Sequence, residues 1–124
     1  MSTKLPLFES PLERALLAQY VERHNAGVRT GDFVAMASLF AEDASMIFLS
    51  VPVGPFVGRD GILAAFRASP PDDELVVDGA GITSVPTSCV TAPYCWARAP
   101  EKTAGKLILT MDRASGLIGT LLVR

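Results

Sequence analysis

The sequence is poor in the residues from which metal sites and disulfides are built. It has one histidine and two cysteines among 124 residues. Structural zinc sites use four Cys or His ligands, so this set is too small to form one. Cys89 and Cys95 stand six positions apart in one predicted strand, about 20 Å along it, which is too far for a disulfide. There is also no phosphate-binding glycine loop. We expect structural cysteines and no cofactor.

Charged residues are also scarce, at 19% of the chain, and the formal net charge is only −2. Basic residues are scattered from Arg14 to Arg124, whereas nucleic-acid binding needs a concentrated basic face. No apolar run approaches the roughly 20 residues that span a bilayer, and the first residues contain no apolar signal segment. These features favour a cytoplasmic protein that binds neither nucleic acid nor membrane.

Hydrophobic residues, in contrast, make up 49% of the chain, enough for the core of one domain. We expect a flexible tail over 1–9 and a single domain over 10–124. Ser10 and Glu13 form a capping box and Pro11 suits the first helical position, so a helix is predicted to begin there. Gly27 is the predicted stop of this helix.

Hydrophobic periodicity predicts the remaining elements. Two further helices are expected over 33–40 and 60–68. Alternation and turn residues predict strands over 44–49, 55–57, 74–78 (extending towards 85), 88–98, 105–112 and 117–123. Helices gathered before a run of strands predict an α+β domain with its helices on one face of the sheet.

Residues 20–67 contain a recognisable series of motifs. The series reads Tyr20-Val-Glu-Arg-His24-Asn25-Ala-Gly27, Gly31-Asp32-Phe33, Leu39-Phe40-Ala41-Glu42-Asp43-Ala44 and Gly58-Arg59-Asp60-Gly61-Ile62. It resembles the nuclear transport factor two-like superfamily, which includes ketosteroid isomerases, SnoaL-like polyketide cyclases, scytalone dehydratase, limonene epoxide hydrolase and non-catalytic binding proteins. The resemblance implies a cone-shaped, curved antiparallel sheet wrapped around three N-terminal helices, a pocket inside the cone, and a homodimer formed through the outer sheet face.

Tyr20 and His24 are the candidate catalytic residues. At i and i+4 they share one face of the first helix. The resemblance places Tyr20 where ketosteroid isomerases carry the tyrosine that donates to the substrate oxygen, and a histidine in a pocket is suited to proton transfer. The alternative is that Tyr20 fills core space and that His24 is a hydrogen-bonded, semi-buried histidine.

The acids of the isomerases are missing. By the same resemblance, Phe48 stands at the position of the catalytic aspartate. The second acid maps near Ile108, on a strand face shared with Lys106 and Thr110, and none of these is a carboxylic acid. Ketosteroid isomerases need an aspartate base and a second, protonated aspartate beside their tyrosine. The sequence therefore predicts that this chain does not use the isomerase mechanism.

Tyr94, Trp96 and Arg98 alternate along one strand and so share a face. This face either lines the pocket or forms the dimer interface, and the enrichment of aromatic residues and arginine at interfaces favours the interface. The Asp-Arg-Asp arrangement of limonene epoxide hydrolase would need Arg98 to meet Asp78 and Asp112, and the sequence does not indicate this.

The pocket is predicted to bind a small apolar molecule. Its expected ligand-binding side chains are Met36, Phe40, Met46, Phe48, Trp96 and Leu109. Two functions are consistent with such a pocket. One is a cofactor-independent isomerase, cyclase or hydrolase that works by proton transfer; the other is a non-catalytic ligand-binding or accessory dimer of the same fold. The sequence does not decide between them and does not name the ligand or the reaction.

Overall fold

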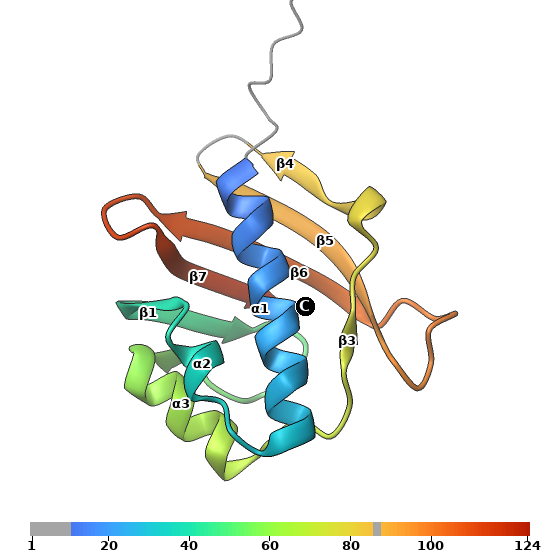
Figure 1. Ribbon diagram of the computed structural model, residues 1–124, viewed down its shortest axis with the longest axis horizontal. Coiled ribbons are helices and arrows are strands. Elements are labelled where there is room, and N and C mark those ends of the chain that lie inside the picture. The colour runs from blue at the N-terminus through green and yellow to red at the C-terminus, as the bar shows by residue number, and fades with distance from the viewer. Residues whose placement is uncertain (1–10, 86–87) are drawn as a thin grey trace, which may run out of the picture.

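One long helix lies across a curved sheet, with two shorter helices beside one of its ends (Figure 1). The computed structural model describes residues 11–85 and 88–124. Within them the helices are α1 (Pro11–Thr30), α2 (Val34–Ala37) and α3 (Arg59–Ala68). The tail predicted over 1–9 and the cap predicted at Ser10 lie outside the described residues.

The sheet of the described residues has seven strands. They are β1 (Phe40–Phe48), β2 (Phe56–Val57), β3 (Leu75–Val76), β4 (Thr83–Val85), β5 (Cys89–Trp96), β6 (Gly105–Asp112) and β7 (Leu117–Val123). Their spatial order is β2-β1-β7-β6-β5-β3, and β4 also pairs with β5. All pairs are antiparallel except β1 with β7, which run parallel. The predicted α+β cone is thus confirmed, with one parallel pair in its sheet.

The first helix ends later than the sequence predicts. It continues through Gly27 to Thr30. Gly31 follows it with φ of +83°, the left-handed conformation that commonly ends helices. Gly27 serves packing instead, because the ring of Phe33 lies directly against its Cα. The glycine thus allows a close approach between α1 and the segment that leads into α2.

The second helix is much shorter than predicted, because the sheet takes over its last residues. The apolar positions at Phe33, Met36, Ala37 and Phe40 are all buried, as the helical pattern requires. Phe40, however, already pairs with Ile118 of β7 and begins β1. The spacing of the buried apolar residues therefore did not show where the helix ends and the strand begins.

The strand predicted over 74–78 and towards 85 is also interrupted. A short 3₁₀ turn, Gly79–Gly81, separates β3 from β4, and the Asp78 carboxylate accepts a hydrogen bond from the N–H of Ala80 at its start. By contrast, β6 and β7 have the predicted bounds. Their pairing was signalled by the turn residues between them.

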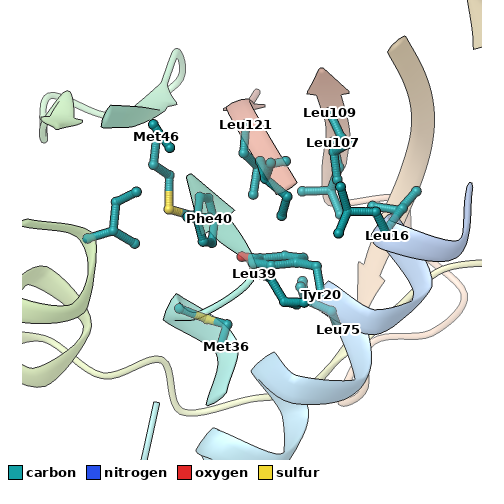
Figure 2. Packing of buried hydrophobic residues seen from close by; sticks show 14 of the residues in the cluster. Leu16, Tyr20, Met36, Leu39, Phe40, Met46, Leu75, Leu107, Leu109 and Leu121 are labelled. Atoms are coloured by element: carbon teal, nitrogen blue, oxygen red, sulfur yellow. The ribbon is translucent and has the colours of Figure 1, made fainter. Parts of the chain in front are cut away.

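The core lies between α1 and the concave face of the sheet. Figure 2 shows Leu16 of α1 beside Leu107 and Leu109 of β6, and the Tyr20 side chain extending towards Phe40. All five side chains are buried. This packing fixes one end of α1 against the sheet and leaves its other half to face a cavity.

Candidate functional site

A cavity of about 640 Å³ lies between α1, α3 and the concave face of the sheet. Its walls are mostly aromatic and aliphatic. They are formed by Tyr20, His24, Met46, Phe48, Ser50, Val51, Val53, Phe56, Ala65, Phe66, Ala68, Ser69, Pro71, Leu75, Tyr94, Trp96, Ala104, Leu107, Val123 and Arg124. No Asp or Glu of the described residues is among them, and Arg124 contributes the one permanently charged side chain of this lining.

Five of the side chains predicted for the site meet at this cavity. They are Tyr20 and His24 from α1, Met46 and Phe48 from β1, and Trp96 from β5. Elements far apart in the sequence are thus brought together as the resemblance implied. Their functional roles stay predictions.

The other three predicted ligand-binding residues lie in the packed core. Met36, Phe40 and Leu109 are 0% exposed and do not line the cavity. The ring of Phe40 packs edge-on against Tyr20, with centroids 6.0 Å apart. Leu109 lies one inward position further along β6 than Leu107, which does line the cavity. These three residues therefore belong to the core rather than to the cavity wall.

Several lining residues were not predicted as ligand contacts. Tyr94 shares the inward face of β5 with Trp96, and both line the cavity. This corrects the preference for an interface on that face. Alternation placed the two residues together, but it did not tell which side of the sheet they occupy. Phe66, an inward position of α3, and Leu75 of β3 complete the wall around His24.

The two positions that the resemblance aligned with isomerase acids lie on opposite sides of the sheet. Phe48 lines the cavity, so its position matches that of a catalytic group although its chemistry does not. Ile108 alternates with the inward residues Leu107 and Leu109, which places it with Thr110 on the outer face. No residue of β6 therefore supplies an acid to the cavity.

The Asp-Arg-Asp arrangement is also not formed. Asp78 caps the turn before β4, and the carboxylate of Asp112 accepts a hydrogen bond from the hydroxyl of Ser115 in the β6–β7 hairpin. Arg98 donates to the backbone of Asp72 instead. Across 11–85 and 88–124, no group of three or more His, Cys, Asp or Glu side chains is placed to hold a metal ion.

His24 lies in an aromatic environment at the cavity wall. Its ring centroid is 6.0 Å from that of Tyr20, 6.2 Å from Phe66 and 6.4 Å from Trp96. Burial lowers the pKa of His24, against smaller opposing effects of its hydrogen bond to Asn25 and of the Glu74 charge. A neutral imidazole, able to accept a proton, is therefore the favoured form near neutral pH.

Asn25 connects His24 to the sheet. The Oδ1 atom of Asn25 lies 2.9 Å from Nδ1 of His24. The same amide bonds both backbone groups of Leu75: Nδ2 donates to the carbonyl at 2.9 Å, and the Leu75 N–H donates to Oδ1 at 2.7 Å. Because Leu75 pairs with Trp96 across β3 and β5, these bonds join two walls of the cavity.

Tyr20 is held as a neutral hydrogen-bond donor. Its side chain is 2% exposed, and burial, followed by the nearby Tyr94, raises the pKa of its hydroxyl above the usual value of 10.0. The Tyr20 hydroxyl forms no hydrogen bond with any residue that the structure describes, and no fully buried polar atom there lacks a partner. The Tyr20 oxygen is therefore not fully buried, and Tyr20 lines the cavity.

The comparisons with known proteins agree with this architecture. The family model of the SnoaL-like domain matches residues 21–98, more than half of the chain. The chain therefore belongs to the SnoaL-like domain family, and the resemblance noted in its sequence is confirmed. No curated protein matches the sequence closely enough to show a relationship.

Solved structures share the fold at low sequence identity. A SnoaL-like protein of unknown function from Burkholderia thailandensis has a TM-score of 0.68 and 15% identity, over 91% of this chain and 93% of that chain. An NTF2-like protein of unknown function from Cytophaga hutchinsonii has a TM-score of 0.66 and 17% identity, over 100% and 93%. A candidate ketosteroid isomerase from Kribbella flavida has a TM-score of 0.58 and 19% identity, over 94% and 78%. These similarities show the fold alone.

None of the helices in the described part of the chain is both long enough and apolar enough to cross a membrane. The longest, α1, carries charged residues along its exposed side and buries Leu16, Leu17 and Tyr20 against the sheet.

Proposed function

We propose that the chain binds a small, largely apolar molecule in its cavity and transfers a proton through His24. The observation that carries this proposal is the place of one neutral histidine in the wall of a mostly apolar cavity. A general base works best when its pKa lies near the pH of the reaction, and among the cavity side chains only His24 meets this condition.

The proposed step uses two side chains of α1. Nε2 of His24 takes a proton from the bound molecule, and the Tyr20 hydroxyl donates a hydrogen bond to the ligand oxygen on which negative charge develops. Tyr20 keeps its own proton because burial raises its pKa. A hydrogen bond of this kind is worth more in an apolar surrounding than in water, and aromatic side chains line the cavity beside Tyr20 and His24.

The test is a panel of enone, epoxide and polyketide-like substrates, assayed with the parent protein and with His24→Ala. A positioned general base contributes roughly 10²- to 10⁴-fold to the rate, so His24→Ala should lose turnover by that factor. Arg23→Ala is a matched control on the neighbouring position of α1, outside the cavity lining. Turnover that is undiminished in His24→Ala would eliminate His24 as the base.

A second function is non-catalytic binding of the same class of molecule. The absence of Asp and Glu from the described cavity wall favours it, because these carboxylates are among the common general acids and bases. Binding of panel members without any turnover in the parent would establish this second function and would contradict the first.

We also propose that two copies associate through the outer face of the sheet. Four side chains form one row across it: Ile47, Leu122, Ile108 and Thr91, as the strand registers show. The adjoining row is uncharged as well, with Ser45, Thr120, Thr110 and Cys89. A second copy presents the same uncharged surface, so a two-fold interface would match apolar side chains on both sides.

A further inference from the structure

The amide of Asn25 is held in one orientation by the backbone of β3. Its Nδ2 faces the Leu75 carbonyl and its Oδ1 faces the Leu75 N–H. A carbonyl only accepts hydrogen bonds and a backbone N–H only donates them. A rotated amide would therefore set donor against donor and acceptor against acceptor. β3 is an edge strand, so the amide takes the place of a neighbouring strand at Leu75.

This orientation determines the proton position on His24. The atom facing Nδ1 of His24 is the Asn25 oxygen, 2.9 Å away, and it has no proton to give. The hydrogen bond therefore needs the proton on Nδ1. In a neutral imidazole the other nitrogen, Nε2, is then a hydrogen-bond acceptor. Nε2 forms no hydrogen bond with any residue of 11–85 or 88–124, and His24 lines the cavity.

We infer that Asn25 is a positioning residue that holds His24 as the Nδ1–H tautomer, so that Nε2 accepts a hydrogen bond or proton from the ligand. The inference rests on the proposed function of the cavity and deepens it. A ligand that meets Nε2 must offer a donor, such as a hydroxyl, an enol or an acidic C–H, while the Tyr20 hydroxyl meets an acceptor. An alcohol or enol oxygen satisfies both.

The structural role of Asn25 and this positioning role are separable. Both predict that removing the amide weakens the attachment of α1 to β3, because two hydrogen bonds to Leu75 are lost. Only the positioning role predicts a change in the tautomer of His24. An unconstrained imidazole favours the Nε2–H tautomer, so the expected change has a definite direction.

The test uses the single histidine of the chain. Labelling with nitrogen-15 histidine gives the spectrum of one imidazole, recorded at a pH well above the pKa of histidine. We expect a protonated Nδ1 and an unprotonated Nε2 in the parent. In Asn25→Ala the acceptor is absent, and the Nε2–H tautomer should become the major form. An Nε2–H tautomer in the parent, or an unchanged Nδ1–H tautomer in Asn25→Ala, overturns the inference.

Asn25→Asp is the matched variant. It keeps an acceptor oxygen for Nδ1 of His24 and for the Leu75 N–H, but it loses the donor to the Leu75 carbonyl. It should lose stability like Asn25→Ala and yet keep the Nδ1–H tautomer. If Asn25→Ala does not fold, the parent and Asn25→Asp decide, since an Nε2–H tautomer in either contradicts the inference. The spectra need no ligand, so a failure of the turnover assay would refute the proposed function and leave this result standing.

Discussion

Replacing Gly27 by alanine tests the packing that supports the site. A Cβ at this position would lie 2.5 Å from Cε1 and 3.0 Å from Cγ of the Phe33 ring, and closer still to Cδ1. Carbon atoms in favourable contact are about 3.5–4.0 Å apart, so the ring must move by about 1 Å. Phe33 is only 2% exposed and packs on Phe66, with centroids 5.3 Å apart, which leaves it little room.

The expected effect is the balance of two terms. Alanine is better than glycine in a helix interior by about 1 kcal/mol, whereas overpacking a core costs about 1–3 kcal/mol. Because two ring carbons would lie within 2.5 Å of the new Cβ, we place the overpacking cost at the upper end, about 2–3 kcal/mol. Gly27→Ala should therefore destabilise the fold by about 1–2 kcal/mol. Gly61→Ala is the control, because Gly61 lies within α3 and its Cβ would meet nothing within 4 Å. It should stabilise the fold by about 0.5–1 kcal/mol.

The assay is urea unfolding of the parent and both variants. With slopes of about 1–3 kcal/mol per molar urea, the two midpoints should move in opposite directions by a few tenths of a molar or more. Gly27→Ala that is as stable as the parent would refute the close packing of Phe33 on α1. A loss of stability in Gly61→Ala would show that the assumed gain in helix propensity from glycine to alanine is wrong, whatever the contact of Gly27 with Phe33.

Three further predictions concern His24, the outer face and Phe48. The contribution of His24 to the free energy of unfolding should be constant above about pH 6.5, the pKa of histidine in an unfolded chain, and should fall as the pH drops towards the lowered pKa of His24. The unfolded chain binds more protons than the folded chain in that window. His24→Gln should abolish this pH dependence in urea unfolding, and an unchanged dependence would contradict the burial of a neutral His24. Light scattering should give a dimer mass for the parent and a monomer mass for Ile108→Lys. The control is Val34→Lys, at an exposed position of α2, and it should keep the dimer mass. A monomeric parent would rule out the proposed interface. Steroid enones should show no measurable isomerisation with the parent, because Phe48 cannot take a proton, and efficient isomerisation would show that Phe48 does not stand at the base position.

The sequence predicted the sheet well where its signals were local. The turn residues between β6 and β7 fixed both strands to their observed ends. Gly27 misled because a glycine that ends a helix and a glycine that admits a neighbouring ring look alike in sequence. The parallel pairing of β1 with β7 is a long-range contact, and no nearby residue signals it.

Helical and strand periodicity predicted which side chains share a face, and this was enough to find part of the site. The i and i+4 spacing placed Tyr20 and His24 together, and both line the cavity. Periodicity marks a side chain as inward but does not tell the core from the cavity wall, which is why Phe40 and Leu109 were expected to meet a ligand. The contact of Asn25 with Leu75 joins residues 50 positions apart and has no signature in the sequence.

Binding in the cavity is tested most directly through Trp96. It is the only tryptophan of the chain, lines the cavity, and lies 6.4 Å from His24 between ring centroids. Titration with 1-adamantanol, which does not absorb where tryptophan does, should change the Trp96 emission saturably. Ala65→Phe, which fills part of the cavity, should abolish the change, and Val34→Phe on the exposed face of α2 should not. No saturable change in the parent, or equal binding by Ala65→Phe, would contradict a ligand site in this cavity.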